Sequence, residues 1–231
     1  MHLNLYGGNL NLLISYPRSG NTWIRYCIEY FTKRLSIGSF NNPNIVEKGI
    51  GYCIPLDVDK GIDPIIYKQH FIQNFQIKNN IIFLIRNFKE VLIKQKWVED
   101  NFFEVFKKEI VKYITLLKKI DKSKNAMIVY YEDLIIKEKF KDIIVKILDK
   151  LGYDIDIDEF MKNYNKHKNR CIELYINYIG GSETKGNKEK YYSKRLGKTE
   201  QQYDDYVKEK YPYIWEKYLK RYEYRNNSNS N

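Results

Sequence analysis

The order of the apolar segments predicts an α/β fold in which helices flank a parallel β-sheet on both faces. Four short apolar runs of strand type alternate with longer stretches of helical periodicity. A second observation is a tight turn containing Gly20, which joins the first strand to the first helix. The four predicted strands are Asn11–Tyr16, Ile65–Tyr67, Ile81–Ile85 and Ala126–Tyr130.

Each predicted strand is followed by a segment of helical or loop character. Ile81–Ile85 is apolar without interruption, which is typical of a strand buried on both faces. Residues 36–62 and 180–197 contain glycine and polar residues and are expected to be loops. Helices are expected at Thr22–Leu35, Asn87–Lys96, Phe103–Ile120, Phe140–Leu151 and Gln201–Tyr222.

Composition favours one globular domain. The 231 residues include 43% hydrophobic and 16% aromatic residues, enough to form a core without disulfides or metals. We see no repeat and no linker, so we expect a single domain over residues 1–225 and a disordered polar tail over 226–231.

Charge and cysteine content limit the partners and the compartment. The net charge of +11 favours an anionic ligand but does not separate a nucleotide from nucleic acid, lipid or polyanionic sugar. The three cysteines match no metal or redox motif, which indicates reduced thiols. No apolar run is long enough for a membrane span or a signal peptide. We therefore expect a cytoplasmic protein without a metal.

The segment Tyr16–Trp23, which reads Y-P-R-S-G-N-T-W, has the parts of a phosphate-binding loop. Gly20 lets the backbone approach a ligand closely, and Arg18 supplies a forked cation. Ser19, Asn21 and Thr22 place polar side chains at the start of a helix, whose N-terminus carries partial positive charge. The Walker spacing is absent, so another kind of phosphate binder is indicated.

This segment resembles the 5′-phosphosulfate loop of the sulfotransferases that use 3′-phosphoadenosine 5′-phosphosulfate (PAPS), commonly Y-P-K/R-S-G-T/N-T-W. Lys68-Gln69-His70 resembles the family's K-x-H element, and Arg86–Val91 resembles R-N-P-K/R-D/E-V. Tyr131–Leu134 resembles Y-E-D-L/M. The four segments occur in the family's order, so the resemblance implies a P-loop NTPase-like sulfotransferase fold.

The resemblance implies transfer of a sulfuryl group from PAPS to a hydroxyl or an amine. His70 would be the general base, because a histidine pKa near 6.5 leaves a neutral imidazole at pH 7. Arg18 and Lys68 would stabilise the transferring group. The donor would be bound by Arg18, Ser19, Gly20, Asn21, Thr22, Trp23, Arg86 and Tyr131, with Arg86 on the 3′-phosphate and Trp23 and Tyr131 on the adenine.

The chain departs from the family pattern at three places. Phe88 replaces the proline, and Lys94 stands where a serine usually contacts the 3′-phosphate. We assign Lys94 to donor binding as well, because a lysine can neutralise a phosphate as a point charge. The family's late 3′-phosphate segment has only an echo in Lys185 and Gly186, which we assign to donor binding. The chain is short for the family, which favours an open acceptor site and a glycan acceptor over a small phenol. The loops at 36–62 and 163–190 are expected to line that site.

Two alternatives stay open from the sequence. A nucleotide-dependent kinase shares the strand–loop–helix arrangement but lacks a Walker lysine here. A noncatalytic binder of polyanionic sugar or nucleic acid would use the basic surface. For the sulfotransferase we expect no nucleic-acid partner, and the sequence does not indicate an oligomeric state. His2 and His167 are expected to be solvated, since His167 lies among Lys and Asn residues.

Overall fold

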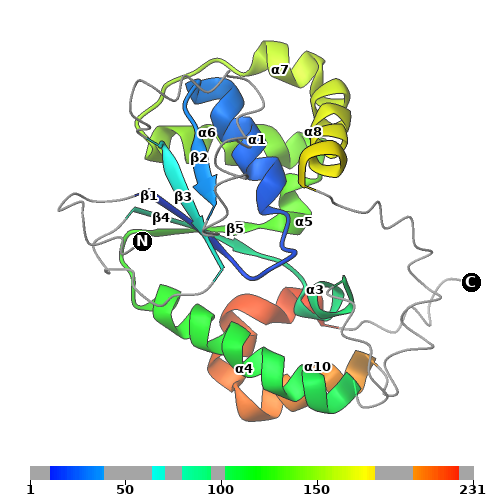
Figure 1. Cartoon of the computed structure of the whole chain (residues 1–231). Coiled ribbons are helices and arrows are strands. Elements are labelled where there is room, and N and C mark those ends of the chain that lie inside the picture. Colours follow the sequence, from blue (N-terminus) through cyan, green and yellow to red (C-terminus); the bar gives the residue numbers. More distant parts are fainter. Residues whose placement is uncertain (1–10, 39–63, 71–79, 95–101, 180–199, 224–231) are drawn as a thin grey trace, which may run out of the picture. The chain divides into compact units, whose positions relative to one another are not determined.

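The computed structural model of the chain describes residues 11–38, 64–70, 80–94, 102–179 and 200–223 (Figure 1). They belong to two compact units, each assembled from two separate stretches of chain. The first unit comprises Met1–Arg86 and Ser123–Glu183, and the second comprises Asn87–Lys122 and Thr184–Asn231. The expectation of a single domain stays a prediction, and the tail at 226–231 lies outside the described residues.

The first unit contains a parallel sheet, which confirms the predicted α/β class. Its strand order is β2-β3-β1-β4-β5, and every neighbouring pair is parallel. All four predicted strands are present, and the short edge strand β2 lies at the start of the expected 36–62 loop. The strands are β1 (Asn11–Ser15), β2 (Ser36–Gly38), β3 (Ile66–Gln69), β4 (Asn80–Ile85) and β5 (Ala126–Tyr130).

The central strands are buried because their apolar residues are continuous. Leu12, Leu13 and Ile14 of β1 are at most 1% exposed, although successive side chains point to opposite faces of the sheet. On one face, Leu13 and Ile82 belong to a core shared with helices of the same unit. Those helices are α1 (Asn21–Thr32), α5 (Tyr131–Leu134), α6 (Lys137–Lys150), α7 (Asp158–Lys162) and α8 (Tyr164–Ile179).

The prediction of a loop over 163–190 is wrong for 164–179, which form α8. Tyr164 and Cys171 are buried two turns apart on this helix, so its inner face packs on the core. His167 between them is half-buried and not fully solvated as expected. Its ring stacks on Phe160 with centroids 4.1 Å apart, and its Nδ1 lies 3.0 Å from the hydroxyl oxygen of Tyr26.

The second unit is helical over its described residues. The predicted continuous helix Gln201–Tyr222 is wrong at Tyr211, because Pro212 disfavours helical backbone at the residue before it. Buried Phe106 contacts Phe88 and Tyr203, with ring centroids 5.6 Å and 4.6 Å away. The helical segments are α3 (Phe88–Lys94), α4 (Phe102–Asp121), α10 (Glu200–Lys210), α11 (Pro212–Ile214), the π-helical Trp215–Leu219 and the 3₁₀ turn Lys220–Tyr222.

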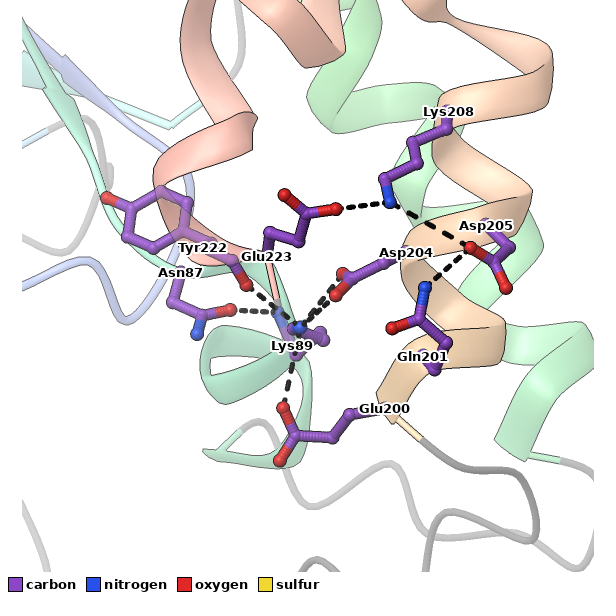
Figure 2. A network of polar contacts seen from close by, with 9 residues as sticks. All are labelled: Asn87, Lys89, Glu200, Gln201, Asp204, Asp205, Lys208, Tyr222 and Glu223. Carbon is purple, nitrogen blue, oxygen red and sulfur yellow. Dashed lines mark hydrogen bonds and ion pairs between the residues drawn. The ribbon is translucent and has the colours of Figure 1, made fainter. Parts of the chain in front are cut away.

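A buried ion pair joins three segments of the second unit (Figure 2). The ammonium of Lys89, a residue that is 2% exposed, lies 2.8 Å and 2.9 Å from the two carboxylate oxygens of Asp204. It also donates to the backbone oxygen of Tyr222 at 3.1 Å and lies 3.4 Å from Glu200. Lys89 thereby ties α3 to α10 and to the C-terminal turn.

Candidate functional site

The topology of the sheet brings the four predicted motifs to one edge. Because all strands are parallel, their carboxyl ends meet there. Strand β1 is central, with β3 on one side and β4 on the other. Ligands of open α/β sheets bind at the carboxyl ends where the strand order reverses, as it does at β1. His70, Arg86 and Tyr131 each follow a strand directly or within one residue.

The loop Tyr16–Gly20, which we call the 16–20 loop, connects β1 to α1. Ser19 N donates to Tyr16 O at 3.3 Å, and Trp23 N donates to Gly20 O at 3.2 Å. Gly20 has φ 87°, and a Cβ there would lie 2.3 Å from two ring carbons of Tyr131. Both the backbone conformation and the close ring therefore require glycine.

The start of α1 can accept an anion. No side chain caps this helix, and its first turn has no acidic residue. The Oγ of Ser19 is buried and has no hydrogen-bond partner among the described residues. The side chain of Asn21, in contrast, turns back to the sheet and donates to Ser15 Oγ at 3.2 Å. Backbone N–H groups and Ser19 Oγ are thus the groups that fit a phosphate here.

His70 is buried beside the end of β1 and is 9% exposed. Its Nδ1 lies 3.0 Å from the carbonyl oxygen of Ser15. A carbonyl oxygen only accepts hydrogen bonds, so Nδ1 carries the hydrogen and Nε2 of the neutral ring keeps its lone pair. Burial, reinforced by the charge of Lys68, lowers the His70 pKa to about 4 despite the bond to Ser15. The imidazole is therefore neutral at pH 7.

Lys68 lies two residues before His70 on β3. Burial, followed by repulsion from Arg25, lowers the Lys68 pKa to about 8. The amine therefore remains mostly charged at pH 7, and a bound anion would stabilise that charge. Lys68 and Arg18, which is exposed in the 16–20 loop, are the cations that we predicted for the reacting group.

Arg86 and Tyr131 both lie against the 16–20 loop. Arg86 is 5% exposed, and its guanidinium carbon is 4.0 Å from the centroid of the Tyr131 ring. Its Nη1 donates to the backbone oxygen of Arg18 at 3.2 Å. The structure thus brings together residues from three of the predicted motifs, while their roles in donor binding stay predictions.

Trp23 is placed in the aromatic core. It is 8% exposed, and its ring centroid lies 5.7 Å from that of Tyr26 and 5.5 Å from that of Phe140. Its buried Nε1 has no partner among the described residues. Other core residues therefore enclose most of the Trp23 side chain, and its contact with adenine stays a prediction.

Three residues assigned to donor binding lie outside the described part of the first unit. Lys94 ends α3 in the second unit, so its contact with the 3′-phosphate stays a prediction. Lys185 and Gly186 lie outside the described residues, so their assignment to donor binding stays a prediction.

Arg25 was missed by sequence reasoning. It is 2% exposed on α1, and its Nε and Nη2 donate to Ser36 Oγ at 2.7 Å and Ser36 O at 2.9 Å. Glu29, one turn later, accepts from Ser36 N at 3.0 Å. The available signal was a charged pair at i and i+4 within an apolar helix face.

The described residues offer neither a metal-binding cluster nor a membrane-spanning helix. No group of three or more His, Cys, Asp or Glu residues in these parts of the chain is arranged to hold a metal ion. Among the described helices, none combines the length and the apolar character needed to cross a membrane.

Comparison with known proteins adds one structural likeness. No family model matches the sequence, and no curated protein matches it. Solved structures similar to this chain include mouse sulfotransferase SULT7A1 complexed with PAP. The sequence identity is 18%, the likeness covers 77% of this chain and 67% of that chain, and the TM-score is 0.46. We draw nothing about function from a likeness of this size.

Proposed function

We propose that this protein transfers a sulfuryl group from PAPS to a hydroxyl or an amine of an acceptor. The observation that carries the proposal is the position of His70, whose Nδ1 is held by the end of the strand that leads into the 16–20 loop. A neutral base and a phosphate-binding loop are thereby joined through Ser15. Four sequence motifs in the order of the PAPS-dependent sulfotransferases support the assignment.

In this proposal His70 Nε2 takes the proton of the acceptor hydroxyl as its oxygen attacks. The bond to Ser15 O keeps the opposite nitrogen protonated, so the ring enters the reaction in the required tautomer. A base with a pKa near 4 is weak, but it is unprotonated at neutral pH. Bound anionic groups of the donor would raise that pKa toward the range of an efficient base.

The donor supplies a sulfuryl group attached to a phosphate that leaves as an anion. Arg18 and Lys68 would stabilise the charge on the leaving and transferring groups, which is the main catalytic contribution expected for a loose in-line transfer. The start of α1 and Ser19 Oγ would hold the 5′-phosphate. Arg86 would bind the 3′-phosphate and Tyr131 the adenine.

For the acceptor we propose a glycan. The basic composition favours an anionic or polar acceptor over an apolar one. We further propose that the protein acts in the cytoplasm without a metal cofactor and without a nucleic-acid partner.

The test is a ligand series measured by thermal unfolding and by transfer of labelled sulfate. Adenosine 3′,5′-bisphosphate at high excess should raise the unfolding temperature of the full chain markedly. ATP with Mg²⁺ should not be hydrolysed, and labelled PAPS should label a polysaccharide acceptor. Absence of stabilisation by the bisphosphate would overturn the proposal. Mg²⁺-dependent ATP turnover would favour the kinase instead.

A further inference from the structure

Arg86 and Tyr131 contact the 16–20 loop in a way that donor binding does not require. We propose that these two side chains form a brace that holds the loop in its binding conformation before a ligand arrives. They would act as positioning residues for whatever anion the loop binds. The proposal extends the proposed function, because it gives Arg86 and Tyr131 a second task at the same site.

The loop needs support from outside because its own backbone is unusual. Arg18 has φ 66°, a left-handed conformation that is disfavoured for a residue with a side chain. Gly20 has φ 87°, so two of the five loop residues are left-handed. The backbone hydrogen bonds at the two ends of the loop, from Ser19 N and Trp23 N, are 3.3 Å and 3.2 Å long, toward the long end of the usual range.

The brace contacts the loop at both unusual residues. Arg86 Nη1 donates to the carbonyl oxygen of Arg18, and the ring of Tyr131 lies against the Cα of Gly20. The guanidinium of Arg86 lies over the Tyr131 ring, so the two side chains also hold each other. The brace therefore supports each left-handed residue from outside the loop.

The register of β4 and β5 sets the positions of the two brace residues. Ile85 of β4 and Tyr130 of β5 are paired in register, and Arg86 and Tyr131 directly follow the two strands. Their side chains therefore leave neighbouring strand ends, and both belong to the same compact unit as the loop. A shift of this register by one residue would separate them from the loop.

The brace makes the geometry of the loop depend on Arg86 whichever anion the loop binds. Arg86 Nη1 supports the loop backbone through Arg18 O, and the guanidinium lies over the ring that contacts Gly20. Loss of Arg86 should thus weaken binding of ligands that have no 3′-phosphate at all.

The first experiment measures the loop without any ligand. Amide hydrogen exchange of residues 16–23 should be at least about tenfold faster in Arg86→Gln and Tyr131→Leu than in the parent chain. Tyr131→Phe keeps the ring and should exchange like the parent. Arg170→Gln is the matched control, because Arg170 is 57% exposed and pairs only loosely with Glu173 at 3.5 Å. Unchanged exchange in both Arg86→Gln and Tyr131→Leu would overturn the brace.

The second experiment separates the brace from the 3′-phosphate role. Arg86→Gln should weaken binding of adenosine 5′-monophosphate about tenfold, although this ligand has no 3′-phosphate, and should weaken the 3′,5′-bisphosphate more. If Arg86 served the 3′-phosphate alone, affinity for the monophosphate would be unchanged, and the proposal would fail. Arg86→Lys, which keeps the positive charge, should fall between parent and Arg86→Gln because lysine lacks the fork.

The two proposals fail in different ways. A parent chain that binds neither nucleotide would overturn the proposed function, and the exchange rates would still decide on the brace. A parent chain that binds both, together with a variant whose loop exchanges normally, would overturn the brace alone.

Discussion

Arg86 and Lys89 lie three residues apart in one motif, yet the molecule uses the two side chains differently. Lys89, in the second unit, is enclosed with both carboxylate oxygens of Asp204 within 2.9 Å of its ammonium. Arg86, in the first unit, contacts the backbone oxygen of Arg18 and the ring of Tyr131. Lys89 thus holds helices together through a buried ion pair, whereas Arg86 supports the backbone of the 16–20 loop. A basic residue in a motif is therefore not a ligand candidate by its position in the motif alone, because the fold can use its charge for packing.

The largest expected effect is a loss of the sulfuryl-transfer rate with little change in nucleotide affinity. His70→Ala should reduce the rate of sulfuryl transfer about 10²–10⁴-fold, because the base is lost. Affinity for adenosine 3′,5′-bisphosphate should change little, since the phosphate loop remains. The measurement is transfer of labelled sulfate beside a binding titration. Turnover that survives in His70→Ala would exclude this residue as the base.

The second largest effect is a loss of stability without a loss of nucleotide affinity, and it concerns the second unit. Asp204→Ala should lower the free energy of unfolding by about 3–5 kcal/mol, because it removes the buried carboxylate of the pair and leaves Lys89 only the more distant and partly exposed Glu200. Urea unfolding measures this loss, while nucleotide affinity per folded molecule should stay unchanged. The double variant Lys89→Met/Asp204→Leu is the control and should recover most of the stability. A loss of nucleotide affinity in Asp204→Ala would break the comparison between the two residues.

A smaller effect is the pH dependence that His70 gives to stability. The unfolded chain protonates this histidine near pH 6.5, but the folded chain does so only near pH 4. The unfolded state binds more protons in between, so stability is complete above pH 6.5 and falls by up to about 3 kcal/mol as the pH drops to 4. Urea midpoints of the parent and His70→Gln, compared across this range, give the contribution. Identical slopes would contradict the lowered pKa.

The smallest effect is expected at an exposed ion pair. Lys141 and Asp158 lie 2.5 Å apart, but their side chains are 49% and 60% exposed. Water screens such pairs, so Asp158→Asn should not shift the urea midpoint measurably. A shift as large as that of Asp204→Ala would mean that burial does not distinguish the two pairs.

The sequence predicted the strands and the loop between β1 and α1 better than the helices around them. The strands and the 16–20 loop follow from apolar runs and a glycine turn, which are local signals. The helix α8 was missed, because its exposed Lys and Asn residues hide the spacing of Tyr164 and Cys171. The buried roles of Arg25 and Lys89 were also missed, since they depend on Ser36 and Asp204, whose proximity only the fold creates.

Trp23 shows a further limit of prediction from local sequence patterns. A tryptophan at the start of a helix is compatible with a ligand platform and with a core position, and the sequence does not separate them. The rings that surround it come from α6, α7 and α8, up to 141 residues later in the chain. Contacts over such distances are set by tertiary packing, which local patterns do not encode.

The group that orients His70 belongs to the main chain. Many histidines are oriented by a carboxylate, which a single codon change removes, but every residue at position 15 would still present a carbonyl oxygen. A substitution of the Ser15 side chain therefore need not change which nitrogen of the imidazole carries the proton. The proton stays on Nδ1 as long as β1 and β3 keep their alignment. The tautomer of this ring therefore depends on the pairing of two strands and not on a neighbouring side chain.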